Sequence, residues 1–151
     1  MKENDPYRRE SLPGFVINRA SKLMTDLLHK NFKEANQEVT PEQWIVLDEL
    51  WRNDGLTQLE IANATFREQT STSRILDNLV KRDFVYRAPN PSDKRSNLIY
   101  LTKKGKGLQK SLMKIVKQTM EDAVSQIDED ELRTCLQVLN TISATISRKI
   151  K

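Results

Sequence analysis

The sequence predicts a mainly α-helical protein with one small β-hairpin. Apolar residues recur at helical spacing through most of the chain. Two short β-type runs, residues 84–88 and 97–101, flank a segment of turn-forming residues, which is typical of a hairpin. The length of 151 residues suits a single domain. Because no apolar run approaches about 18 residues, we expect no transmembrane helix.

Capping residues mark where the helices begin. In a capping box, a Ser or Thr accepts a hydrogen bond from the third helical residue, whose Glu or Gln side chain returns one. The pattern occurs at Thr40–Gln43 and again at Thr57–Glu60, and Thr102 and Asp128 are expected to cap later helices. The expected helices cover about residues 13–36, 41–53, 57–63, 68–82, 102–127 and 128–150, and residues 1–11 are expected to be loosely ordered.

Positive charge is concentrated in the middle of the chain. The net charge is +4 and the isoelectric point about 9.2. Residues 57–106 contain ten Lys and Arg against five Asp and Glu, an excess of +5, so the rest of the chain is nearly balanced. A local basic patch indicates a polyanionic partner. A solvated basic surface remains an alternative when charge alone is considered.

The helix predicted over residues 68–82 has the composition of a DNA-reading helix. Its inner face carries Ile75, Leu76, Leu79 and Val80, and its opposite face carries Thr70, Ser71, Arg74, Asn78 and Lys81. Small hydroxyl side chains allow the backbone to approach base edges in the major groove. Arg74 can contact guanine or clamp a phosphate, and Gln69 can pair with adenine. The alternative is an ordinary amphipathic helix with a polar solvent face.

The hairpin that follows has a polar, basic tip at residues 89–96. We expect Asp93 to hold Arg95 through an ion pair, so that the guanidinium can enter a narrow minor groove. Lys94 and Arg87 would add phosphate contacts, which position a protein without reading sequence. Together with the two preceding short helices, the hairpin predicts a winged helix-turn-helix. A surface hairpin whose charge serves only solubility is the alternative.

The terminal helices carry more apolar surface than one small core can cover. The last helix has two apolar stripes, which together exceed the width that a surface helix needs for one core. A second copy of the chain could cover them through a two-fold contact, and a dimer suits a palindromic DNA site. A monomeric helical bundle is the alternative. Cys135, the one cysteine, lies on this apolar face and is expected to be buried and inert. A single cysteine also fits a reducing cytoplasm.

Four linked motifs resemble the MarR family of winged helix-turn-helix regulators. They are Ser73-Arg74-Ile75-Leu76-Asp77-Asn78-Leu79, Val85-Tyr86-Arg87, Asp93-Lys94-Arg95 and Leu101-Thr102-Lys103-Lys104-Gly105. The resemblance covers the chain from about residue 13 to the end. One departure is Asp83, where the family commonly has glycine, and Asp tolerates the left-handed backbone that such a turn requires.

The resemblance implies a triangular homodimer that represses transcription at a pseudo-palindromic operator in double-stranded DNA. It implies one MarR-like domain over residues 1–151, with dimerisation helices at about 13–36 and 106–151 and a DNA-binding lobe at about 40–105. Thr70, Ser71 and Arg74 would approach the major groove, and Arg95 the minor groove. The full expected DNA-binding set is Gln69, Thr70, Ser71, Ser73, Arg74, Arg87, Asp93, Lys94 and Arg95.

The resemblance further implies release from DNA by a small aromatic or anionic effector. Position in the chain suggests Arg19, Trp44, Leu47 and Trp51 as effector-binding residues, although Trp44 also suits a core position. We expect no enzyme activity, cofactor or metal, because His29 is the single histidine and no phosphate-binding glycine motif is present. The alternative function is a winged-helix protein-interaction module without specific DNA binding.

Overall fold

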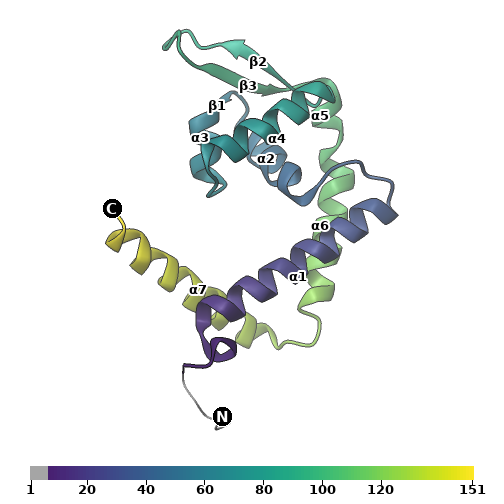
Figure 1. The fold of residues 1–151 in the computed structure, drawn as a ribbon. Coiled ribbons are helices and arrows are strands. Elements are labelled where there is room, and N and C mark those ends of the chain that lie inside the picture. The colour runs from purple at the N-terminus through teal and green to yellow at the C-terminus, as the bar shows by residue number, and fades with distance from the viewer. Residues whose placement is uncertain (1–6) are drawn as a thin grey trace.

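A computed structural model describes residues 7–151 of the chain, and it contains the expected helices and hairpin in the expected order, with an added short 3-10 helix η1, an added strand β1 and a division of one helix into two (Figure 1). The elements are η1 (Arg9–Ser11), α1 (Pro13–Glu34), α2 (Pro41–Arg52), β1 (Leu56–Thr57), α3 (Gln58–Ala64), α4 (Gln69–Lys81), β2 (Val85–Pro89), β3 (Asn97–Leu101), α5 (Lys103–Gly107), α6 (Gln109–Ala123) and α7 (Glu129–Lys149). Residues 1–6, part of the segment expected to be loosely ordered, lie outside the described residues. None of the described helices is long and apolar enough to cross a bilayer.

The elements form a lobe and a set of longer helices that extend from it. Figure 1 shows α2, α3, α4, α5 and the sheet gathered in the lobe, with α1 and α6 crossing beneath it and α7 extending to one side. α1 and α6 pack together, and Asn31 Nδ2 donates to Thr119 Oγ1 at 2.8 Å between them. The buried core lies mainly within the lobe and continues along this packed pair.

Local chemistry accounts for the helix starts that the sequence predicts. Both capping boxes are present: Gln43 N donates to Thr40 Oγ1 at 3.2 Å, and Glu60 N donates to Thr57 Oγ1 at 3.2 Å. Pro41 occupies the first turn of α2, where its missing N–H leaves no helical hydrogen bond unmade. Asp128 caps α7 by accepting from two backbone N–H groups of the first turn.

The sheet has three strands, one more than the expected hairpin. β1 pairs antiparallel with β3, with Leu56 opposite Ile99, and β2 pairs antiparallel with β3, with Tyr86 opposite Tyr100. The added strand is only two residues long and leads directly into α3. Asp54 Oδ1 accepts from the Leu101 backbone N–H at 2.8 Å, which fastens the approach to β1 onto the sheet.

The helix expected from Thr102 onward is divided into α5 and α6. The division falls at Leu108, and within α5 Gly105 lies against the chain before β2, because a Cβ at this position would stand 2.0 Å from the Phe84 carbonyl oxygen. Only glycine allows α5 to approach the start of β2 so closely. Trp51 Nε1 donates to the Gly105 carbonyl at 3.1 Å, which adds α2 to the same contact. Asp83 adopts the left-handed backbone that was expected of it, with φ of 61°.

Helix α7 has no core of its own in a single chain. It buries no side chain among the described residues, and Leu136 and Ile146 are 52% and 49% exposed. The expectation that Cys135 is buried is wrong for the single chain, where its thiol is exposed. The apolar surface along α7 is the surface that the sequence assigns to a second copy.

Candidate nucleic-acid interface

Helix α4 presents a polar face outward, as its sequence pattern predicts. Thr72, Leu76 and Leu79 are buried against the lobe, at the three- and four-residue spacing of one helical face. Of the residues expected to read DNA, Gln69, Thr70 and Arg74 are exposed and Ser71 and Ser73 are half-buried. Thr72 Oγ1 is satisfied internally by donating to the Glu68 carbonyl at 3.0 Å. The hydroxyl and guanidinium groups on the outward face are therefore exposed, on a helix of the width that a DNA major groove admits.

The turn between α3 and α4 is fixed by contacts on both sides. Gln58 Nε2 donates to the Gln69 carbonyl at 3.2 Å, which ties the start of α3 to the start of α4. Thr65 Oγ1 donates to the Ile61 carbonyl at 2.8 Å and closes the end of α3. Phe66 takes a left-handed backbone, with φ of 54°, and its side chain is 95% exposed. The two helices thus form a helix-turn-helix with α4 as its outer helix.

The tip between β2 and β3 is a hydrogen-bonded turn that holds two basic side chains outward. Ser92 N donates to Asn90 Oδ1, and Asn90 Nδ2 donates to Ser96 Oγ, both at 3.0 Å. Asp93 Oδ1 accepts from the Arg95 backbone N–H at 2.9 Å. The expected ion pair is therefore wrong in its detail, because within the described chain Asp93 fixes the backbone of Arg95 and leaves the guanidinium unpaired. Lys94 and Arg95 are both exposed.

A groove joins the helix and the wing. A cavity of about 430 Å³ lies between them and is lined on one side by Gln58 and Gln69 and on the other by Arg95. Arg87 on β2 forms an ion pair with Asp77 on α4, with Nη2 and Oδ1 2.6 Å apart. This contact, which was not expected, links the wing to α4.

Glu60 is the acidic group of this face whose protonation is shifted. Its carboxylate accepts from the Thr57 backbone N–H at 2.7 Å and from the Thr57 hydroxyl at 3.0 Å. The backbone hydrogen bond is the largest cause that holds the pKa of Glu60 below its ordinary value, and the hydroxyl is the second. Glu60 therefore stays ionised at the start of α3, where the helix dipole also favours a negative charge.

Comparison with known proteins supports the architecture. The model of the MarR family matches residues 39–96, which run from the start of the lobe through α4 to the wing tip. Residues 39–96 are a MarR-family domain. The chain is therefore a winged helix-turn-helix transcriptional regulator.

Relatives of the MarR family extend the match over nearly the whole chain. The HTH-type transcriptional repressor NicR of Pseudomonas putida is 23% identical over 137 residues, which are 91% of this chain and 85% of NicR. The structure of the transcriptional repressor CouR bound to a 23-mer DNA duplex is similar with a TM-score of 0.80 and 29% identity, covering 94% of this chain and 99% of CouR. The structure of a cysteine-to-serine variant of Escherichia coli MarR in complex with operator DNA is similar with a TM-score of 0.79 and 25% identity. The match covers 85% of this chain and 91% of the MarR chain.

The structure separates the four residues suggested for effector binding in this MarR-family chain. Leu47 is fully buried in the core, and Trp51 is held by its bond to Gly105. Trp44 packs against the core with its indole N–H buried and without a hydrogen-bond partner among the described residues. Arg19 lies exposed on α1 with its guanidinium 5.8 Å from the centre of the Phe15 ring. Within one chain these side chains therefore do not converge on a common described cavity, and their role stays a prediction.

Three residues of the interface were missed by reading the sequence. Asp77 lies within the motif that carried the family resemblance, yet its pairing with Arg87 depends on how β2 crosses α4. Asn90 donates to Ser96, six positions further on, and Gln58 donates to the Gln69 carbonyl, eleven positions further on. An Asn followed by Pro in a turn is the one local signal that could have identified Asn90.

Proposed function

We propose that this chain is a homodimeric repressor that binds a pseudo-palindromic operator in double-stranded DNA and leaves it when a small ligand binds. The observation that carries the proposal is the exposed polar face of α4 beside an exposed basic wing tip, with the two joined by one groove. The relatives named as repressors, and the two relatives described in complex with DNA, support it.

Each side chain of the interface has a role that its chemistry suits. Thr70, Ser71 and Ser73 let α4 approach the major groove closely, and Gln69 and Arg74 pair with base edges. On the wing, Arg95 enters the minor groove, while Lys94 and Arg87 contact phosphates. Asp93 contributes by fixing the backbone that carries Arg95.

The dimer supplies two reading helices at a fixed separation. We propose that residues 1–151 form one domain, in which about 13–36 and 106–151 provide the dimerisation helices and about 40–105 the DNA-binding lobe. The exposed apolar residues of α7 support this division, because burying them needs a second copy. Since the target is chromosomal DNA, we place the protein in the cytoplasm.

Selection from a random duplex pool, followed by gel shifts on the selected sequence, tests the proposal. Arg74→Ala should weaken binding to the selected site by about 1–3 kcal/mol, and should weaken binding to random DNA much less. Arg95→Ala should weaken binding and leave the dimer intact. Lys117→Ala, which removes an exposed charge on α6, is the matched control and should bind as the unchanged protein does.

The salt dependence of the same gel shifts separates this function from the alternative. Neutralising several phosphates makes the logarithm of affinity fall steeply as the logarithm of salt concentration rises. If selection returns no preferred sequence and affinity does not change with salt, the chain is a protein-interaction module instead.

A further inference from the structure

A buried nitrogen without a partner lies beside α4. Arg67 belongs to the turn that joins α3 to α4, and its Nε is buried with no hydrogen-bond partner among residues 7–151. The backbone here is fixed, because Arg67 N donates to the Ala62 carbonyl at 2.9 Å and Phe66 takes a left-handed conformation. A charged donor that is partly buried and unpaired destabilises a fold. Arg67 therefore lacks an acceptor that the chain itself does not supply.

Arg67 lines a cleft between α4 and the start of α2. The volume of this cleft is about 390 Å³. Its polar lining includes Thr40, Glu42 and Gln43 at the start of α2, together with Arg67, Ser71 and Arg74. The wing contacts a different flank of α4, where Arg87 pairs with Asp77. The residues already assigned to DNA lie on α4 and on the wing, so the flank beside α2 has no assigned contact of its own.

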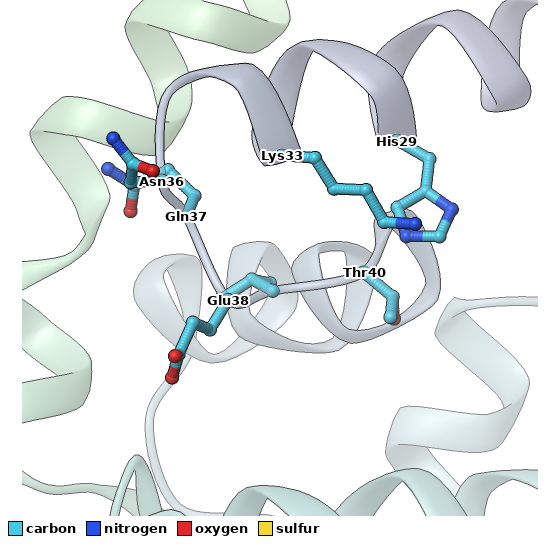
Figure 2. Close-up of a pocket in the computed structure, with 7 residues that line it drawn as sticks. His29, Lys33, Asn36, Gln37, Glu38 and Thr40 are labelled. Atoms are coloured by element: carbon cyan, nitrogen blue, oxygen red, sulfur yellow. The ribbon is translucent and has the colours of Figure 1, made fainter.

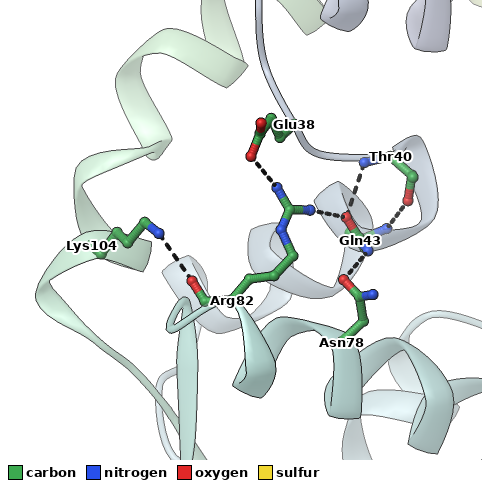
Figure 3. A network of polar contacts seen from close by, with 6 residues as sticks. All are labelled: Glu38, Thr40, Gln43, Asn78, Arg82 and Lys104. Carbon is green, nitrogen blue, oxygen red and sulfur yellow. Dashed lines mark hydrogen bonds and ion pairs between the residues drawn. The ribbon is translucent and has the colours of Figure 1, made fainter.

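The wall of the cleft that α2 contributes has its hydrogen bonds satisfied within the chain (Figure 3). Gln43 Nε2 donates to Asn78 Oδ1 on α4 at 2.8 Å. Gln43 Oε1 accepts from Thr40 N at 3.1 Å and from Arg82 Nη1 at 3.3 Å, and the Thr40 hydroxyl accepts from Gln43 N at 3.2 Å. These contacts make a rigid wall, and they hold α2 at a fixed distance from α4.

The donors on the other wall are unused. Within the described part of the chain, the side chains of Arg67, Ser71 and Arg74 make no hydrogen bond or ion pair. The acid of the cleft, Glu42, is exposed in the first turn of α2 and pairs with neither arginine. Two guanidinium groups and a hydroxyl without acceptors suit an anion with several oxygens. Phosphate is such an anion, and arginine binds it through paired hydrogen bonds.

We propose that this cleft holds one phosphate of the DNA backbone, with Arg67 as its clamp. A helix that lies in the major groove has a phosphate backbone on each side of it. The wing reaches toward one side, and the cleft beside α2 receives a phosphate from the other. The Arg67 guanidinium and the Ser71 hydroxyl donate to the phosphate oxygens, while Arg74 extends to a base edge. This inference rests on the proposed function, because it adds a backbone contact to the DNA interface.

The substitution Arg67→Met tests the clamp, because methionine fills similar space without a charge. The urea midpoint should stay the same or rise, since an unpaired buried donor is removed. Affinity for the selected operator should fall about tenfold, and affinity for random duplex DNA should fall by the same factor. In gel shifts over a range of salt, the slope of log affinity against log salt should become shallower by about 1.8. Each phosphate contact contributes about 0.9 to that slope, and the dimer loses two.

Lys33 provides the matched control. It is an exposed, unpaired basic residue near Thr40, but it extends from α1 and lines a separate cavity beside His29 (Figure 2). Lys33→Met should leave operator affinity and the salt slope unchanged. Arg67→Lys should keep the slope and lose several-fold in affinity, because lysine retains the charge without the paired donors. Equal changes of slope in Arg67→Met and Lys33→Met would reduce the effect to general charge and overturn the clamp.

Operators in which one phosphate is replaced by a neutral methylphosphonate locate the contact. One position in each half-site should weaken binding by the unchanged protein several-fold and leave binding by Arg67→Met unaffected. Calorimetric titration with inorganic phosphate, without DNA, should show no binding. The clamp is overturned if no position distinguishes the two proteins, or if Arg67→Met lowers the urea midpoint with an unchanged salt slope. Binding of inorganic phosphate that Arg67→Met abolishes would assign the cleft to a free anion instead. Selection of an operator by the unchanged protein tests the proposed function independently.

Discussion

The lobe and helix α7 use apolar residues of the same kind in opposite ways. Leu47 and Leu50 in the lobe are fully buried by contacts within the chain, whereas Leu136 and Ile146 on α7 are about half exposed. The lobe therefore satisfies its own core, while α7 depends on a surface that one chain does not supply. Stability of the lobe and stability of the assembly are then separate properties, and different substitutions should affect them.

The largest effect is expected from charges placed on α7. Leu136→Asp combined with Ile146→Asp should make the protein sediment as a monomer, because two carboxylates cannot be buried unpaired in an apolar interface. Operator affinity should fall by about 100-fold or more, since one half-site is lost. Thermal unfolding of the lobe should change little, and Asn140→Asp, which adds a charge to the same helix, is the control. A doubly substituted protein that stays dimeric would contradict the comparison.

A pair of glycine substitutions tests how tightly the lobe is packed. Gly105→Ala forces a Cβ against the Phe84 carbonyl and should lower the free energy of unfolding by about 3 kcal/mol. Gly107→Ala meets nothing within 4 Å and should raise it by about 0.5 kcal/mol, because alanine favours the helix. Urea titration of both variants measures the difference. Equal changes in the free energy of unfolding for the two variants would mean that the lobe does not require the close approach of α5 to β2.

Asp83 offers a smaller change in the opposite direction. With its φ of 61°, Asp83→Gly should stabilise the lobe by up to about 1 kcal/mol by relieving the left-handed backbone. Asp83→Ala should destabilise the lobe, because alanine lacks the tolerance of aspartate for this conformation. The order glycine, aspartate, alanine in urea midpoint is the expected result. Sedimentation should be unchanged throughout.

The smallest effect is a dependence on pH at the start of α3. The folded state holds the pKa of Glu60 below its ordinary value near 4.5, so this contribution is present above that pH and is lost as pH falls through the lowered pKa. Glu60→Gln should flatten this part of the stability curve below about pH 4.5. Because Glu60 is exposed, solvent screening keeps the effect slight. Identical pH profiles for the two proteins would assign the acid sensitivity to other carboxylates.

The parts of the fold that depend on residues close together in the sequence could be predicted from the sequence. Thr40 and Thr57 predict the starts of α2 and α3, because each capping residue and its partner lie three positions apart. The strand β1 could not be predicted, since two residues become a strand only by pairing with Ile99 and Leu98. The need for glycine at position 105 likewise depends on Phe84, which lies 21 residues earlier in the chain.

The candidate interface shows the same limit. Periodicity alone places Thr70 and Arg74 on the outer face of α4, and the structure leaves both exposed. The sequence correctly predicts that Asp93 contacts Arg95, but the Asp93 carboxylate accepts from the Arg95 backbone N–H and not from its guanidinium. In a turn, backbone N–H groups compete with guanidinium groups for a nearby carboxylate.

The 2.6 Å ion pair between Asp77 and Arg87 restricts how such a regulator can be switched. It links the first strand of the wing to the middle of α4, so in the proposed complex it would favour a constant offset between the major-groove and minor-groove contacts of one subunit. Partial disengagement, with one element on the duplex and the other lifted away, is therefore disfavoured. In the proposed dimer, an inducer would instead alter the distance or tilt between the two subunits, and tolerance to base changes should be lower within a half-site than in the spacer between half-sites.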